Sequence, residues 1–254
     1  MPRLSSSVFG FSDFRGFTRQ LVLWNLASFF ILWILGAFAR GWAGAIVGLL
    51  ALDPALVLHH GFIWQLATYS LIHGGILSTL LELMSLWFTA SFLEANHGSR
   101  WLAEIFFVSV VGAGLCALAL SFFVAPVMPL STCWGGIFGL LIVYGVRYGD
   151  LEMMLFPLPM TIKAKYLVWV WMLVATAVLF TVMHLFAMAE LGGALFGWLY
   201  LRFAPRRGFA FAGSEGAFGL RNKYYRWKRR RAAKKFEVYM RKHDGRGPGP
   251  GSVN

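Results

Sequence analysis

Two acidic residues lie inside long apolar stretches of the chain. Glu82 falls in LSTLLELMSLWFTASFLE, residues 77–94, and Glu190 falls in AELGGALFGWLY, residues 189–200. A charged side chain at bilayer depth costs on the order of 2.5–3.5 kcal/mol even on lenient scales, so such groups usually face a bundle interior and mark function. Both are therefore candidate binding residues. Either they form a polar pocket that accepts a donor from a client helix, or, when protonated, they bridge helices of this chain.

Candidate nucleophiles precede the glycine-rich run WGGIFGLL, residues 134–141, where Ser131, Thr132 and Cys133 are consecutive. Nucleophilic catalysis needs a hydroxyl or thiol within hydrogen-bond reach of a base, and donors aimed at the developing oxyanion. Ser131 or Cys133 would reach a base such as Glu190 only if the helix that follows began at a shifted position. One step along a helix start turns a side chain by roughly 100°. The two cysteines form no C-x-x-C arrangement, so we expect no disulfide framework, metal site or cofactor.

Composition defines the elements that must position these residues. The 254 residues are 58% hydrophobic and 13% charged, whereas charged residues make up nearer a quarter of a soluble domain. We therefore expect an all-α integral membrane protein with a lead at residues 1–19, a six-span domain at 20–203 and a tail at 204–254. Residues 40–70 are expected to form an interfacial loop with a short helix. The expected spans are residues 20–39, 77–94, 101–124, 130–146, 166–185 and 186–203.

Glycines at four-residue spacing mark two of these spans. One pair is Gly135 and Gly139, and the other is Gly193 and Gly197. Small residues let helix backbones approach closely in lipid, where van der Waals packing drives helix association. The spacing predicts two tightly apposed helices.

These glycine-containing segments resemble the two active-site helices of the rhomboid family of intramembrane serine proteases. In that family a G-x-S-G motif supplies the nucleophile, and a histidine before the glycine pair of the last helix is the base. The matched positions here hold Trp134 and Glu190. The family's H-x-x-x-N pair, which helps to stabilise the oxyanion, is matched by Ser78 and Glu82.

Two further stretches are similar to the family, FIWQLATYSLIHGG with Gln65 where an arginine is common, and FPLPMTIKAKY. The resemblance covers roughly residues 62–201 and implies a six-helix rhomboid-like bundle. Loss of the matched residues implies a degenerate pseudoprotease without hydrolysis. Such a member would bind transmembrane segments of client proteins through Glu82, Trp134 and Glu190. The alternative is an active intramembrane serine peptidase with a displaced nucleophile, and a transporter or channel is a distant third.

Charge placement predicts both termini in the cytoplasm, because short cytoplasmic loops of membrane proteins are enriched in Lys and Arg. The tail from Arg202 carries fifteen Lys and Arg against three acids, so its balance of +12 equals the net charge of the chain. Residues 222–243 of this tail have the pattern of a basic amphipathic helix. It either binds anionic lipid head groups or is a solvated, topology-setting tail, and we expect no nucleic-acid partner. The short loops and compact core favour a bacterial inner membrane.

Overall fold

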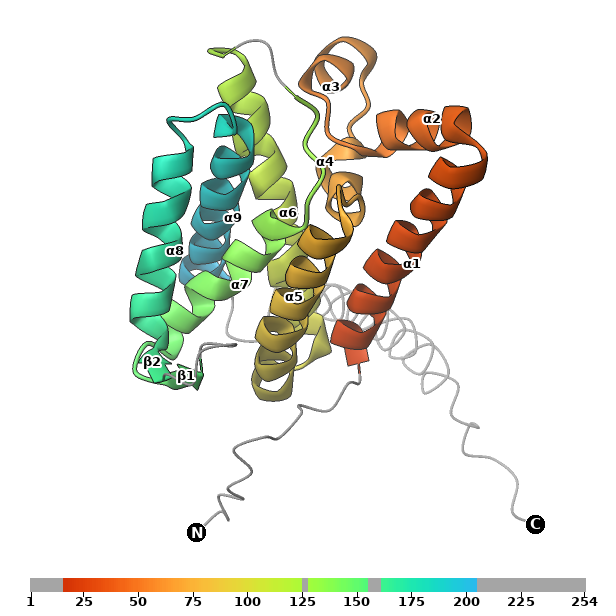
Figure 1. Ribbon diagram of the computed structural model, residues 1–254. Coiled ribbons are helices and arrows are strands. Elements are labelled where there is room, and N and C mark those ends of the chain that lie inside the picture. Colours follow the sequence, from red (N-terminus) through yellow and green to blue (C-terminus); the bar gives the residue numbers. More distant parts are fainter. Residues whose placement is uncertain (1–15, 125–127, 155–160, 205–254) are drawn as a thin grey trace, which may run out of the picture. The chain divides into compact units, whose positions relative to one another are not determined.

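The computed structural model describes residues 16–124, 128–154 and 161–204, and within them helices dominate (Figure 1). Residues 1–15 of the expected lead at 1–19 and the basic tail beyond residue 204 lie outside the described residues, and the last four residues of that lead belong to a helix. The helices and strands follow one another as α1 (Gly16–Phe38), α2 (Arg40–Leu50), α3 (Pro54–His60), α4 (Gln65–Thr68), η1 (Tyr69–Leu71), α5 (Ile76–His97), α6 (Ser99–Ser121), α7 (Trp134–Arg147), β1 (Glu152–Met154), β2 (Thr161–Lys163), α8 (Ala164–Val178) and α9 (His184–Phe203).

Four of the described helices are long and apolar enough to cross a membrane, namely α1, α5, α6 and α9. Helices α7 and α8 are apolar but have only 14 and 15 residues. At 1.5 Å per residue they are about 21–23 Å long, against a hydrocarbon core of about 30 Å. The all-α membrane class is therefore supported, whereas the number of six spans stays a prediction.

Two expected helix boundaries are wrong. A backbone bridge delays the start of one helix, and a turn ends the other helix early. Helix α7 begins at Trp134 and not at Leu130, because Leu130 forms an antiparallel bridge with Leu52 through two 2.9 Å hydrogen bonds. Helix α8 ends at Val178 and not at residue 185. A turn follows, in which the Thr181 hydroxyl donates to the Val178 carbonyl at 2.7 Å, and α9 begins at His184.

Glycines set the close packing of α7 against α9. A Cβ added at Gly193 would overlap the carbonyl oxygen of Gly135, and one added at Gly197 would lie 2.7 Å from the carbonyl oxygen of Gly139. Gly139 also faces Ser109 of α6. Figure 1 shows α7 between α8 and α5, with α9 and α6 behind it. The small residues thus let three backbones meet at one place, and α7 is buried along most of its length.

Helix α1 has few buried residues, which are Thr18, Leu21 and Asn25, so polar contacts attach it to the bundle. The Glu94 carboxylate of α5 accepts hydrogen bonds from the backbone N–H groups of Phe17 and Thr18 at 2.6 and 2.8 Å. A carboxylate is stabilised there by the positive end of the helix dipole. Further along α1, the Ser28 hydroxyl donates to the Leu71 carbonyl at 2.5 Å.

The segment between α1 and α5 folds into short helices, whereas its expected place at the membrane interface stays a prediction. Gln65 is fully buried and ties this loop together. Its Oε1 accepts from the Asp53 backbone N–H at 3.0 Å, and its Nε2 donates to the Gly48 carbonyl at 3.0 Å. This neutral amide thus satisfies loop backbone groups that would otherwise be buried without partners.

We predict that Gly193→Ala lowers the free energy of unfolding by about 1–3 kcal/mol, because the new methyl group forces α7 and α9 apart. Gly44→Ala is the matched control, since a Cβ there meets nothing within 4 Å. That change should be neutral or stabilising by roughly 0.5–1 kcal/mol, because alanine favours a helix. Thermal unfolding in detergent, followed by tryptophan fluorescence, compares the two. Equal midpoints would contradict the close α7–α9 contact.

Candidate functional site

The carboxyl group of Glu82 is the centre of a buried polar cluster. Its Oε2 lies 2.9 Å from His73 Nδ1 and accepts from the backbone N–H and the thiol of Cys133 at 3.1 and 3.3 Å. Its Oε1 accepts from the Thr132 hydroxyl at 3.0 Å. The side chains of His73 and Glu82 are 0% and 5% exposed. One carboxyl group therefore holds together the segment before α5, α5 itself and the segment that leads into α7.

Local structure explains how these residues meet. The chain leaves η1 at Ile72, and His73 comes directly before the glycine pair that precedes α5. Glu82 is two turns into α5, on its buried face. Cys133 is the residue that caps α7, and the Thr132 hydroxyl accepts from the Trp134 backbone N–H at 3.1 Å. The Glu82 carboxyl thus lies at the positive end of the α7 dipole, which favours negative charge.

Asn25 of α1 extends the cluster and determines which ring nitrogen of His73 carries a hydrogen. The Asn25 Nδ2 donates to the Leu21 carbonyl at 2.7 Å, which leaves Oδ1 to face His73 Nε2 at 3.0 Å. Because that oxygen can only accept, Nε2 must carry a hydrogen. The Nδ1 atom either donates to an ionised Glu82 or accepts from a protonated one. The pair therefore shares one proton and is neutral overall in both arrangements.

This neutrality makes the burial tolerable. An isolated ion at bilayer depth is costly, whereas a paired and fully hydrogen-bonded group is not penalised in the same way. Removing one partner of a buried pair typically costs about 3–5 kcal/mol, since it leaves the other uncompensated. The cluster therefore fixes the relative positions of α1, α5 and α7, and its members depend on one another.

Glu190 is placed differently from Glu82. It is half-buried on α9. Within the described part of the chain, no hydrogen bond is made by its carboxyl group, either to Glu82 or to the candidate nucleophiles Ser131 and Cys133. Of these two carboxyl groups, Glu82 is hydrogen-bonded within the chain, whereas Glu190 has no hydrogen bond from the described residues.

The other residues matched to catalytic positions have packing or capping contacts. Trp134 packs against Trp171 of α8, with ring centroids 5.5 Å apart and the rings tilted by 32°, and lies edge-on to Phe138 at 6.2 Å. Ser78 is exposed at the start of α5, where its hydroxyl donates to the Gly75 carbonyl at 2.9 Å. It is therefore a capping residue away from the cluster, and Ser131 is half-buried beside Thr132.

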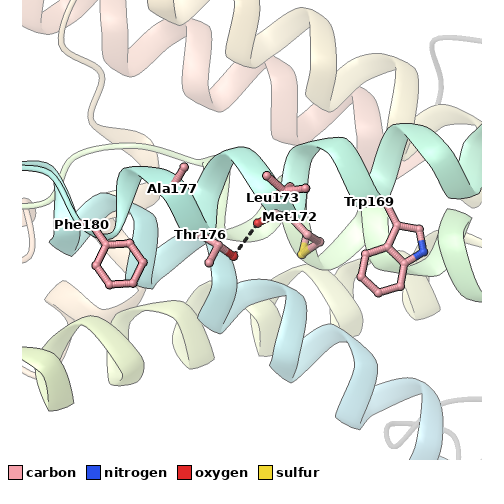
Figure 2. A pocket seen from close by; sticks show the side chains of 6 residues that line it. All are labelled: Trp169, Met172, Leu173, Thr176, Ala177 and Phe180. Atoms are coloured by element: carbon pink, nitrogen blue, oxygen red, sulfur yellow. Dashed lines mark hydrogen bonds between the residues drawn. The ribbon is translucent and has the colours of Figure 1, made fainter.

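A shallow apolar groove of ≈ 360 Å³ runs along α8 and does not coincide with the cluster. Figure 2 shows its six lining side chains, of which five lie on α8 and Phe180 lies in the turn that follows it, far from Trp169. The Thr176 hydroxyl in this groove donates to the Met172 carbonyl at 2.7 Å. The groove thus offers an apolar surface to a lipid or a helix but no group for polar chemistry.

Sequence reasoning missed three members of the cluster. Asn25 and His73 were not singled out, and Thr132 was considered only as a neighbour of the nucleophile position. The available signals were weak: a polar amide inside the first apolar span, and a histidine before Gly74 and Gly75. Because the partners are far apart in the chain, no local spacing pattern connects them.

Three members of the cluster also have the arrangement of metal ligands. The donor atoms of His73, Glu82 and Cys133 all lie within 4.8 Å of one another.

The fold and the buried cluster define a multi-pass helical membrane protein. Residues 23–213 match the family described as eukaryotic integral membrane protein (DUF1751), and the chain belongs to that family. No curated protein matches the chain. The expected bacterial inner membrane is therefore wrong, because the family is eukaryotic. Short loops and a compact core follow from helix packing in any bilayer, so they carry no information about the organism.

We predict that His73→Leu lowers the free energy of unfolding by about 3–5 kcal/mol, because Glu82 then stays buried without its partner. The double variant His73→Leu with Glu82→Leu should recover part of that loss. His59→Leu is the matched control, since His59 is exposed. Thermal unfolding in detergent measures all three. A His73→Leu protein as stable as the control would show that the pair does not support the fold.

Proposed function

We propose that this protein is a rhomboid-like membrane protein that binds transmembrane segments of client proteins and does not hydrolyse them. Glu190 is the residue that carries the proposal. A half-buried carboxyl at membrane depth without a hydrogen bond from the described residues is a functional group by default, because lipid supplies no partner. A polar side chain in the transmembrane helix of a client would supply one.

The contacts of Glu82 argue against hydrolysis. Acyl transfer needs unoccupied donors where the oxyanion develops. The Cys133 backbone N–H and the Thr132 hydroxyl, which lie beside the matched nucleophile position, are already bound to Glu82. Trp134 holds the nucleophile position and offers no hydroxyl or thiol. A negative carboxyl among these donors would repel an oxyanion rather than stabilise it.

A defined probe tests the proposed binding. Two leucine-rich single-span segments, one with a central Asn and one without, are reconstituted with the full-length protein in lipid vesicles and their association is followed by energy transfer. We predict about 3- to 20-fold tighter association of the Asn segment, which corresponds to an interhelical hydrogen bond of about 0.6–1.7 kcal/mol.

Three variants test whether the preference for the Asn segment depends on Glu190. Glu190→Leu should abolish it, whereas Glu190→Gln should keep it, because an amide also forms hydrogen bonds. Trp198→Leu is the control for a large change at an exposed position of the same helix. Equal association of the two segments with the unmodified protein would refute binding through Glu190.

One observation favours the alternative, an active peptidase with a displaced nucleophile. The Cys133 thiol lies 3.3 Å from a carboxyl oxygen of Glu82, which is within reach of proton transfer. However, Cys133 is fully buried, so a substrate carbonyl would reach it only after the cluster opened. Incubation of the purified protein with a transmembrane substrate separates the two functions. Cleavage that persists in Ser131→Ala and is lost in Cys133→Ala would establish the alternative and reject the inactive protein.

A further inference from the structure

We propose that His73, Glu82 and Cys133 bind a divalent transition-metal ion of the zinc class within the bundle. The three donor atoms are His73 Nδ1, a Glu82 carboxylate oxygen and Cys133 Sγ, and they all lie within 4.8 Å of one another. The inference is independent of client binding, because Glu190 does not belong to this group of donors.

The distances between the donors fit a single ion. Zinc bonds of about 2.0–2.1 Å to nitrogen or oxygen and about 2.3 Å to sulfur place tetrahedral ligands roughly 3.3–3.6 Å apart. The observed separations are 2.9 Å between His73 Nδ1 and Glu82 Oε2 and 3.3 Å between Cys133 Sγ and the same oxygen. The third pair, His73 Nδ1 and Cys133 Sγ, lies within 4.8 Å. An ion would move the first two pairs apart by a few tenths of an ångström and would hold the nitrogen and the sulfur at roughly 3.3–3.6 Å, and the three ligands would leave a fourth position for an oxygen donor.

The surrounding hydrogen bonds orient the ligands as metal sites require. A ligating histidine usually donates its other ring N–H to a fixed acceptor, which directs the free lone pair at the metal. Asn25 Oδ1 has this role at His73 Nε2, at 3.0 Å. Thr132 holds Glu82 Oε1 at 3.0 Å, and the Cys133 backbone N–H holds Oε2 at 3.1 Å, so the second lone pair of Oε2 is directed to the ion.

Charge balance selects a divalent ion. Without metal, the His73 and Glu82 pair is neutral and Cys133 is a thiol. With metal, neutral His73, carboxylate Glu82 and thiolate Cys133 carry a charge of −2, which a divalent cation cancels. Binding therefore releases two protons, one shared by His73 and Glu82 and one from the Cys133 thiol, and the buried cluster stays neutral. Mixed nitrogen, oxygen and sulfur donors favour zinc over the hard ions magnesium and calcium.

The metal content of the purified protein tests the site. The full-length chain is produced in a eukaryotic host with zinc in the medium, purified in mild detergent with a reductant and a tag that contains no histidine, and analysed by elemental mass spectrometry. We expect about one zinc ion per chain, as for a single site of three protein ligands. Cys116→Ser, which changes the other cysteine, should keep the ion. Cys133→Ser and His73→Gln should lower the metal content by about tenfold or more.

Asn25→Ala separates a metal site from a simple hydrogen-bond cluster, because it removes no ligand. Loss of the acceptor that orients a histidine weakens metal binding by about 10- to 100-fold. Zinc retained on dialysis against a graded chelator series should fall by that factor in Asn25→Ala and stay unchanged in His59→Ala, whose side chain is exposed.

Cobalt provides a readout that does not depend on the folding of any ligand variant. Cys116→Ser protein produced with cobalt in place of zinc should show a thiolate-to-cobalt charge-transfer band, which only Cys133 can supply, since the chain has two cysteines. If this protein lacks the band and the unmodified protein contains no stoichiometric transition metal, the cluster is only a hydrogen-bond network and the proposal is wrong. Zinc that persists in well-folded Cys133→Ser would overturn it equally.

Discussion

The burial of the Glu82 carboxyl group inside an apolar bundle is the constraint on which much of the structure depends. A carboxyl at that depth must find donors within the protein, because neither lipid nor water supplies them. Its four partner atoms come from His73, Thr132 and Cys133, which lie before α5 and before α7. The non-helical backbone that enters α7 is thus stabilised where lipid could not stabilise it. Asn25 connects the same cluster to α1, whose other contacts with the bundle are few.

Close helix packing and the polar cluster support each other. The glycine contacts between α7 and α9 determine how closely these helices approach, and α6 packs against the same seam through Ser109. The position of α7 in turn places Cys133 and Thr132 against Glu82. A change in either feature would therefore disturb the other, because the same short helix takes part in both.

The carboxyl groups of Glu82 and Glu190 have different surroundings although both lie on apolar helices. Glu82 is enclosed and satisfied by its own chain, which suits a structural or metal-binding role. Glu190 is half-buried and has no hydrogen bond from the described residues, which suits recognition of another helix. This division is the physical basis of the proposed binding of partner helices without cleavage.

The sequence by itself determined the helical membrane class, the approximate positions of the long helices and the close packing at the glycine pairs, and it directed attention to Glu82 and Glu190. These follow from apolar runs and residue spacing, which are local properties of the chain. It misplaced the start of α7 and the end of α8, because the Leu52 bridge and the Thr181 turn depend on backbone pairing that composition does not encode. Only the tertiary structure brought Asn25, His73 and Cys133 to Glu82. Those residues are up to 108 positions apart, from 25 to 133, and the requirement to satisfy a buried carboxyl can be met by donors from any part of the chain.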